Sequence, residues 1–304
     1  MEYILETDLL TKRYRNFSAL NGLTMHIPKG SIYGFVGRNG AGKTTLIRLI
    51  CGLQEPSGGE YKLCGVKNTD KKIILCRRKM GAVVESPAIY TEMTAEENLR
   101  QQNYILKATN EGNISELLTL VGLGNTGKKK VKNYSLGMRQ RLGIAIALAG
   151  NPEFLVLDEP INGLDPQGIV EMRELILKLN RERGITVLIS SHILDELSRL
   201  VTHYGFIDGG RMIKEMSTEE LEKRCRKCIC VDVSDTRPLA DVLDGMGVEY
   251  EILDGTRANI YSDVQVTLLV TELLKKDCIV YGMKEHDENL ESFYMNLVGG
   301  ERNA

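Results

Sequence analysis

Residues 31–50 read SIYGFVGRNGAGKTTLIRLI. The apolar segment at 32–36 predicts a buried strand, a glycine-rich loop follows at 37–44, and helical spacing continues from Thr45. The loop fits the pattern G-x-x-x-x-G-K-[ST] in full, and a strand before it and a helix after it are the context that this pattern requires. We therefore expect a loop that binds the phosphate groups of a nucleotide.

The chemistry of this loop predicts a role for each of its residues. Glycines allow backbone N–H groups to curl around phosphate oxygens, and the helix N-terminus adds a partial positive charge. Lys43 would reach the β and γ phosphates, and the Thr44 hydroxyl would ligate Mg²⁺. The nucleotide-binding residues expected in this stretch are Gly37, Asn39, Gly40, Ala41, Gly42, Lys43, Thr44 and Thr45.

A second predicted strand ends in two carboxylates. Residues 154–157, FLVL, form the continuous apolar run that is typical of a strand covered on both faces of a parallel sheet. Asp158 is then placed to join the Mg²⁺ ligands, and Glu159 to orient and deprotonate an attacking water. A metal-binding carboxylate beside one that serves water indicates a hydrolase.

Between these motifs lies NYSLGMRQRLGIAIALAGNP, residues 133–152. Residues 139–148 have helical periodicity, and Ser135 and Gly137 open the helix with a capping hydroxyl and a flexible glycine. A helix N-terminus binds anions. Because the first loop already surrounds one nucleotide, we expect this second anion site to serve a nucleotide held by another subunit.

With these motifs the sequence resembles the ATP-binding subunits of ABC transporters. YSLGMRQR (134–141) looks like a variant of the LSGGQ signature, NGLDP (162–166) looks like the D-loop, and His192 in LISSHILDE matches the switch histidine. The resemblance puts Tyr14 where an aromatic ring stacks on adenine, with Phe17 as the alternative. It implies that ATP and Mg²⁺ are bound and that ATP is hydrolysed, and it implies catalytic roles for Lys43, Glu159 and His192.

The stretch GAVVESPAIY, residues 81–90, puts Glu85 at the end of a predicted strand. In most such ATPases a glutamine, the Q-loop residue, stands here, near the Mg²⁺ and the water, and its loop touches the membrane subunit. With glutamate at this position the sequence resembles the branch of the family that exports, or confers immunity to, peptide antibiotics such as bacitracin and lantibiotics. Glu85 is thus a predicted catalytic and metal-binding residue. Whether it ligates Mg²⁺ directly, is protonated, acts only through its loop or is a solvated acid stays open.

Composition narrows the class of protein. The chain has 304 residues, of which 26% are charged, and a net charge of -2, without the basic excess of a general nucleic-acid binder. Its seven cysteines, odd in number and scattered, suit reduced thiols. Cys225, Cys228 and Cys230 form a C-x-x-C-x-C cluster, but a structural zinc site normally has four ligands. No window approaches the length of a membrane span, so another chain would do the spanning.

The predicted fold class is α/β: a P-loop ATPase core with an antiparallel β subdomain and a helical signature subdomain, followed by a small α+β module. We assign residues 1–217 to the ATPase domain, with the helical subdomain at about 94–150, where a capping box at Thr94 to Glu97 begins a helix. Residues 218–304 follow a βαββαβ order that resembles a ferredoxin-like module. For this module we favour a regulatory or dimer-bracing role over small-ligand sensing.

The resemblance implies an ATPase that powers a transporter for a peptide antibiotic. Two copies would enclose two ATP molecules and act on polytopic permease subunits, which keeps the protein in the cytoplasm at the inner face of the membrane. One alternative is a drug-sensing or target-protection complex. The other is a mechanical ABC protein acting on nucleic acid or ribosomes; such proteins usually carry tandem cassettes, long coiled coils or basic arms, and direct nucleic-acid binding is not expected here.

Overall fold

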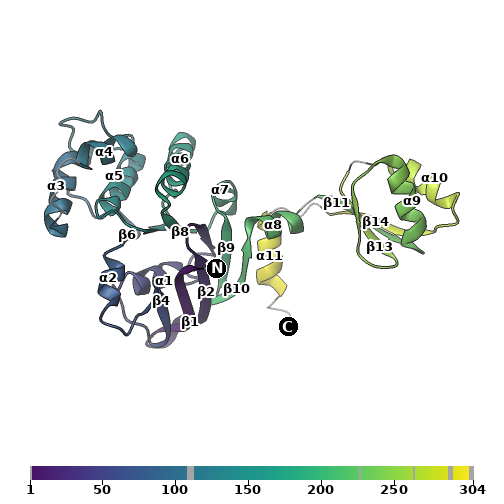
Figure 1. The fold of residues 1–304 in the computed structure, drawn as a ribbon, viewed down its shortest axis with the longest axis horizontal. Coiled ribbons are helices and arrows are strands. Elements are labelled where there is room, and N and C mark those ends of the chain that lie inside the picture. Colours follow the sequence, from purple (N-terminus) through teal and green to yellow (C-terminus); the bar gives the residue numbers. More distant parts are fainter. Residues whose placement is uncertain (1, 108–112, 226, 263, 287–289, 301–304) are drawn as a thin grey trace. The chain divides into compact units, whose positions relative to one another are not determined.

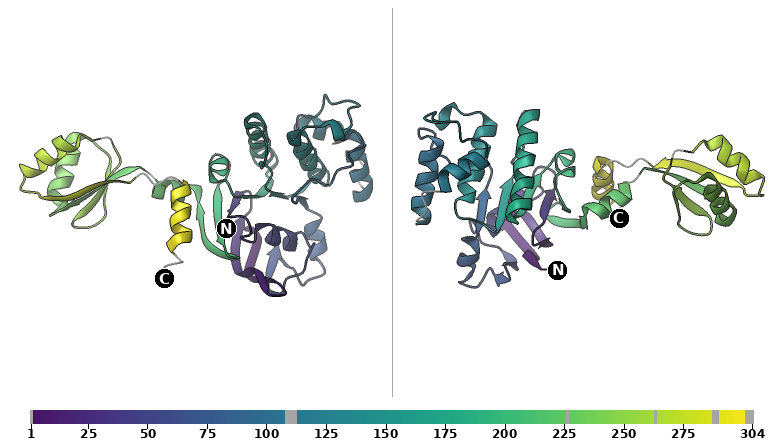
Figure 2. Two further views of the ribbon diagram at one scale, coloured as in Figure 1. Left: turned by 180° about the vertical axis from the view of Figure 1, so that it is seen from behind. Right: turned by 45° about the horizontal axis from the view of Figure 1, so that its top comes forward.

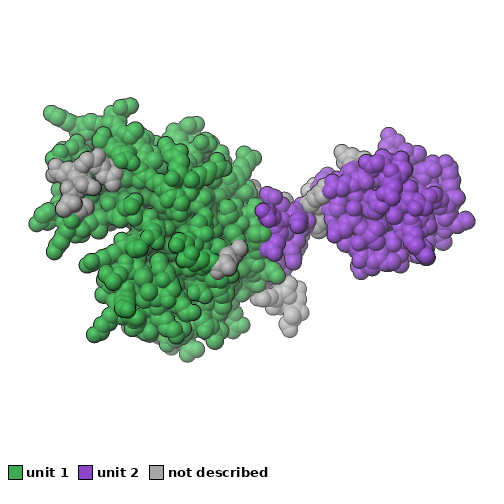
Figure 3. All heavy atoms as spheres, in the orientation of Figure 1, with its two compact units in different colours: residues 1–218 green, residues 219–304 purple. Residues whose placement is uncertain are grey.

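The computed structural model describes residues 2–107, 113–225, 227–262, 264–286 and 290–300. The chain divides into two compact units, residues 1–218 and 219–304 (Figure 3). Among the described residues, no helix combines the length and the apolar character that crossing a membrane requires.

The first unit is built around a six-stranded sheet with the order β10-β9-β3-β8-β7-β6 (Figure 1). Its neighbouring strands run parallel except β10, which is antiparallel to β9 at one edge. The strands β3, β7 and β8 are buried along their whole length, as expected of strands covered on both faces. The bounds are β3 Ile32–Val36, β6 Met80–Val83, β7 Phe154–Asp158, β8 Thr186–Ser191, β9 His203–Asp208 and β10 Arg211–Ser217.

A second, antiparallel sheet has the order β2-β1-β4-β5. One hydrophobic core joins this sheet to helix α1 and to the central sheet, so α1 is held on both sides. That helix directly follows the glycine-rich loop, which is therefore carried by a rigid support. The bounds are β1 Tyr3–Tyr14, β2 Phe17–Pro28, α1 Lys43–Ile50, β4 Gly58–Leu63, β5 Val66–Lys67 and α2 Ile73–Arg77.

Helices α3, α4 and α5 gather at one side of the first unit (Figures 1 and 2). The predicted capping box is present, because the Thr94 hydroxyl accepts from the Glu97 N–H at 3.2 Å and the Glu97 carboxylate accepts from the Thr94 N–H at 2.7 Å. The helix bounds are α3 Ala95–Leu106, α4 Asn113–Leu120, α5 Leu136–Leu148, α6 Pro166–Arg183 and α7 Leu194–Ser198, with a 3₁₀ turn at Val131–Asn133.

The second unit contains an antiparallel sheet with the order β12-β13-β11-β14, and helices α9 and α10 contribute to its core. The predicted βαββαβ order is found. The bounds are α8 Thr218–Cys225, β11 Cys228–Val233, α9 Thr236–Met246, β12 Tyr250–Ile252, β13 Arg257–Ile260, α10 Val266–Leu274, β14 Val280–His286 and α11 Leu290–Gly300. The predicted fold class, an α/β core with an added antiparallel sheet and helical group and a C-terminal α+β module, is confirmed.

The close approach of α5 to the sheet edge gives a stability prediction. A Cβ atom at Gly81 on β6 would lie 2.4 Å from the Ala147 carbonyl oxygen on α5, and backbone cannot yield to it cheaply. We expect Gly81→Ala to lower the free energy of unfolding by about 1–3 kcal/mol. Gly150→Ala is the matched control, because its nearest neighbour would be at 3.6 Å, an ordinary contact. Urea unfolding of both variants checks this, and equal stabilities would contradict it.

Candidate functional site

The glycine-rich loop joins β3 to α1, and its shape requires glycine. Gly42 caps α1 with φ 112°, and Gly40 has φ 81°, both in the left-handed region that favours glycine. A Cβ atom at Gly42 would also lie 2.5 Å from the Ala19 carbonyl oxygen. The backbone here can therefore fold tightly around an anion at the helix N-terminus.

Lys43 lies across this loop with its side chain buried. Its Nζ donates to the Gly37 carbonyl at 2.6 Å and to the Arg38 carbonyl at 3.3 Å. The same nitrogen is 3.2 Å from Glu159 Oε1. Glu159 directly follows β7, which is separated from β3 by β8 in the sheet. The ammonium is thus fixed between loop carbonyls and a carboxylate.

Asp158 is the last residue of β7 and is buried. Its Oδ2 accepts from the Thr44 hydroxyl at 2.9 Å, and its Oδ1 accepts from the Ser190 hydroxyl at 2.5 Å. Asp158 and Ser190 are directly paired in the parallel register of β7 and β8. Both carboxylate oxygens are therefore oriented by hydroxyl donors.

Glu159 leaves the strand with φ 51°, a left-handed conformation that is uncommon for a side chain other than glycine. Its N–H donates to the Ser190 hydroxyl at 2.9 Å and to the Ser190 carbonyl at 3.2 Å. Its Oε2 lies 2.6 Å from His192 Nδ1. The strained backbone and these contacts hold the Glu159 carboxylate between Lys43 and His192.

Two residues of this constellation escaped the sequence analysis. Ser190 is one, and the hydroxyl two positions before His192 is the signal that could have indicated it. Glu196, on α7, is the other. Burial raises the pKa of the Glu196 carboxyl; His192 opposes that shift, and the charge of Glu159 adds to it. Glu196 is therefore close enough to interact electrostatically with both residues.

A pocket of about 320 Å³ opens beside the loop. Tyr14, the residue expected to stack on adenine, is absent from its lining; its hydroxyl donates to Gln54. Phe17, the alternative, lines the pocket and is 60% exposed. The lining residues are Phe17, Ala19, Asn39, Gly40, Gly42, Lys43, Thr44, Thr45, Glu159 and Asn162.

Ser135 caps α5, where its hydroxyl accepts from the Met138 N–H at 3.3 Å. Gly137 follows in the first turn, and a Cβ there would meet Leu164 at 3.7 Å, which is ordinary contact. Neither residue lines the pocket beside the glycine-rich loop. The predicted helix opening is present, and a nucleotide contact from these two residues stays a prediction.

Glu85 lies on the loop after β6, outside the lining of that pocket. Its Oε1 accepts from Arg48 Nη2 on α1 at 2.5 Å. Its predicted roles in metal binding and catalysis stay predictions.

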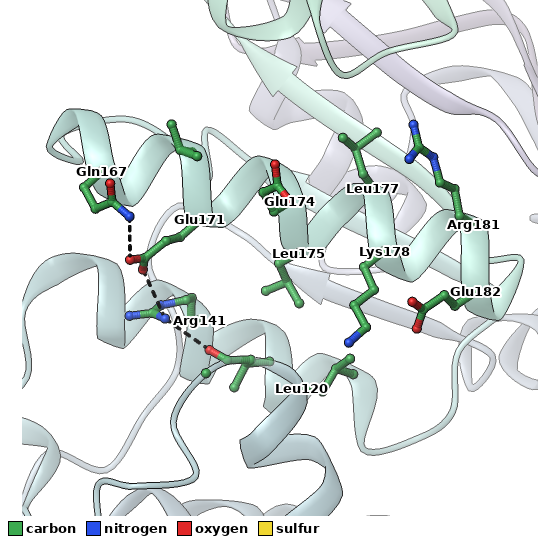
Figure 4. A pocket seen from close by; sticks show the side chains of 13 residues that line it. Leu120, Arg141, Gln167, Glu171, Glu174, Leu175, Leu177, Lys178, Arg181 and Glu182 are labelled. Atoms are coloured by element: carbon green, nitrogen blue, oxygen red, sulfur yellow. Dashed lines mark hydrogen bonds and ion pairs between the residues drawn. The ribbon is translucent and has the colours of Figure 1, made fainter.

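A larger pocket of about 720 Å³ lies between the end of α4, α5 and α6 (Figure 4). Arg141 on α5 pairs with Glu171 on α6 at 3.2 Å, and Gln167 donates to the same carboxylate at 3.2 Å. None of the residues predicted for the nucleotide site lines this pocket. The pocket instead marks where α5 is tied to α6.

Side chains that could hold a metal ion are few in the described part of the chain. There, no group of three or more His, Cys, Asp or Glu side chains converges as a metal site. The sulfurs of Cys228 and Cys230 lie 3.9 Å apart on β11. The Thr44 and Asp158 oxygens, by contrast, are the kind of ligand that Mg²⁺ takes while keeping several waters.

Comparison with known proteins identifies relatives over the whole chain. The family described as "ABC transporter" matches residues 20–162. The bacitracin transport ATP-binding protein BcrA of Enterococcus faecalis is 39% identical over 303 residues, covering 99% of this chain and 98% of its own. The lantibiotic transport ATP-binding protein SrtF of Streptococcus pyogenes is 42% identical, covering 72% of this chain and 95% of its own. The dimeric ATP-binding cassette MJ0796 in a post-hydrolysis state with ADP and Pi superposes with a TM-score of 0.64 at 25% identity, covering 70% of this chain and 98% of its own.

The Ser190 hydroxyl gives a prediction that depends on geometry alone. Ser190→Ala removes a donor to the buried Asp158 carboxylate and one acceptor of the Glu159 N–H. We expect the free energy of unfolding to fall by about 1–3 kcal/mol, because a buried acceptor loses its partner. Ser18→Ala is the control, since that hydroxyl donates to the Leu20 carbonyl in a partly buried site. Urea unfolding measures this change. If the Ser190→Ala protein unfolds at the same urea concentration as the parent, the hydrogen bonds assigned to Ser190 are contradicted.

Proposed function

This chain belongs to the ATP-binding subunits of ABC transporters, and from that premise we propose how its residues bind and hydrolyse ATP and what the hydrolysis drives. The observation that carries the proposal is that the Glu159 carboxylate contacts both Lys43, at 3.2 Å, and His192, at 2.6 Å, beside the glycine-rich loop.

The residues 37–45 bind the triphosphate. Backbone N–H groups of the loop, the α1 N-terminus and the Lys43 ammonium supply the positive charge for the β and γ phosphates. The left-handed glycines Gly40 and Gly42 support this, because they leave room for backbone to approach the ligand. Asn39, Ala41 and Thr45 complete the loop around the phosphates, with Gly37 at its start.

Thr44 and Asp158 hold Mg²⁺. Their oxygens lie side by side, and Ser190 fixes the rest of the carboxylate. When bound, the ion neutralises charge on the phosphate oxygens. Ser190 acts as a positioning residue, because it also sets the backbone of Glu159.

Glu159 is the general base. A water oxygen attacks the γ phosphorus, the bond from that phosphorus to the bridging oxygen of ADP breaks, and the water proton passes to the Glu159 carboxylate. His192 orients that carboxylate through its contact at 2.6 Å. Lys43, whose Nζ lies 3.2 Å from Glu159 Oε1, binds the phosphates once ATP is present.

The adenine stacks on an aromatic side chain at the end of the first hairpin. The family resemblance favours Tyr14. The position of Phe17 on the pocket wall supports Phe17 instead. Weaker ATP binding by the Phe17→Ala protein would decide in favour of Phe17.

A second copy of the chain completes each site with its Ser135 and Gly137. Support comes from the position of the α5 cap outside the pocket lining and from the dimeric state named for the cassette MJ0796. ATP closes the dimer and hydrolysis opens it. Permease subunits embedded in the membrane receive this motion, which keeps the protein at the cytoplasmic face.

The transported substrate is a peptide antibiotic, and the activity confers resistance to it. The full-length match to a bacitracin transport protein and the match to a lantibiotic transport protein support this substrate class. The C-terminal module, which lies within the matched length of the bacitracin transport protein, regulates or braces the dimer. The same ATPase in a complex that dislodges the drug from its target is the second candidate.

Glu159→Gln tests the base. The amide keeps the size of the side chain and cannot accept the water proton, so we expect hydrolysis to slow by about 10²–10⁴-fold while ATP binding is retained. The ATP-bound dimer should accumulate on size-exclusion chromatography. Glu153→Gln is the control at the other end of β7, where the exposed carboxylate pairs with Lys79 at 2.7 Å. Undiminished turnover in Glu159→Gln would remove Glu159 from this role.

Drug challenge tests the substrate. Cells that produce the chain with its permease should tolerate more bacitracin or lantibiotic than cells producing the Lys43→Ala chain, because only the first can use ATP. Tolerance to an unrelated antibiotic should stay the same. If the complex is a transporter, labelled peptide should leave the cells. If it is a target-protection complex, resistance should rise without export of the peptide. Equal tolerance of both strains to every peptide tested would contradict the proposed substrate class.

A further inference from the structure

The loop after β6 has an unusual conformation and a charged anchor. Glu85 has φ 59°, in the left-handed region, and the Ser86 N–H donates to the Val84 carbonyl at 2.7 Å. The tight turn directs the Glu85 carboxylate to Arg48 on α1, the helix that begins at the phosphate-binding loop. The ion pair therefore joins two elements that are far apart in sequence.

The same loop is fitted against α5. A Cβ atom at Gly143 would lie 2.6 Å from the Pro87 Cβ and 2.8 Å from its Cγ, so the proline ring packs directly on the helix backbone. The loop also has a fixed far end, because the buried Asn98 side chain on α3 accepts from the Tyr90 N–H at 2.8 Å and donates to the Tyr90 carbonyl at 3.0 Å. A movement of residues 84–87 must therefore displace α5 or strain the loop.

The opposite side of α5 is tied to α6 by the Arg141–Glu171 pair, and Arg141 also donates to the Val121 carbonyl at 3.4 Å (Figure 4). The first residue of this helical segment is the cap Ser135. The orientation of the cap thus depends on contacts along both sides of α5, one of which leads back to α1 through the loop.

We propose that Arg48 is a positioning residue: its ion pair with Glu85 links the phosphate-loop helix α1 to the cap of α5 through Pro87 and Gly143. In this view Glu85 acts as the partner of Arg48, and the metal is left to Thr44 and Asp158. The inference rests on the proposed function, in which Ser135 serves the ATP of a second copy.

The exposure of the pair suits a link that opens and closes. The Arg48 and Glu85 side chains are 36% and 58% exposed, and exposed ion pairs contribute little to stability. Breaking the link should therefore change local opening and turnover by about two- to five-fold, since that is the range such pairs reach. Loss of the fold is not expected.

Hydrogen exchange of the full-length protein tests the link without any activity assay. In Arg48→Gln and in Glu85→Gln, amides of residues 84–86 and of the first turn of α5 should exchange about two- to five-fold faster. The double variant should be no faster than either single variant, and the swap Arg48→Glu with Glu85→Arg should restore slow exchange. Arg100→Gln is the control, because Arg100 forms another exposed ion pair, with Glu96 within α3 at 2.8 Å. Unchanged exchange at the α5 cap in Arg48→Gln would overturn the proposal.

Steady-state kinetics separate the link from a metal role. Arg48→Gln and Glu85→Gln should lower kcat by the same factor and leave the KM for ATP and the half-saturating Mg²⁺ concentration at the parent values. If Glu85→Gln alone shifts the Mg²⁺ dependence, Glu85 serves the metal and the inference is wrong. If the parent protein itself hydrolyses no ATP, the proposed function fails instead, and the exchange measurements still decide whether the link exists.

Discussion

The parallel register of β3, β8 and β7 is the constraint on which the site depends. These strands are neighbours in the central sheet and end at the same edge, so the loop after each one emerges at that edge. The first loop carries the glycines of residues 37–42, the second carries His192 and the third carries Glu159. A slip of β8 by one residue along β7 would separate Asp158 from Ser190 and turn the Ser190 side chain to the other face of the sheet. Burial of both faces of these strands fixes that register.

The sequence predicted the parts of this site that are continuous in the chain. The glycine-rich loop, the strand ending in Asp158 and Glu159 and the capped helix at Ser135 each have a local pattern, and each occurs where it was expected. Contacts between strands have no such pattern. The role of Ser190 depends on its register opposite Asp158, and the partner of Glu85 depends on a turn with φ 59° that brings the carboxylate to α1. Such contacts could be read only from the assembled structure.

The aromatic residues near the pocket illustrate the same limit. Tyr14 and Phe17 stand at the two ends of the turn between β1 and β2 and are directly paired. The tyrosine hydroxyl finds a partner in Gln54, whereas the phenylalanine ring is left on the pocket wall. In the second unit, alternation of elements sufficed to predict the fold, because each strand and helix there has its own turn and period.

The Lys43–Glu159 contact has a consequence for the reaction. A buried ammonium needs an anionic or carbonyl partner, and here Glu159 and the Gly37 carbonyl supply it. In the proposed function the γ phosphate would bring a stronger anion to the same nitrogen. ATP binding would then exchange one partner of Lys43 for another, and the fold has already offset the cost of burying the ammonium. The Glu159 carboxylate, no longer needed by Lys43, remains held by His192 and by its left-handed backbone. In the function proposed above, the arrival of the γ phosphate would therefore free the Glu159 carboxylate to act on the attacking water.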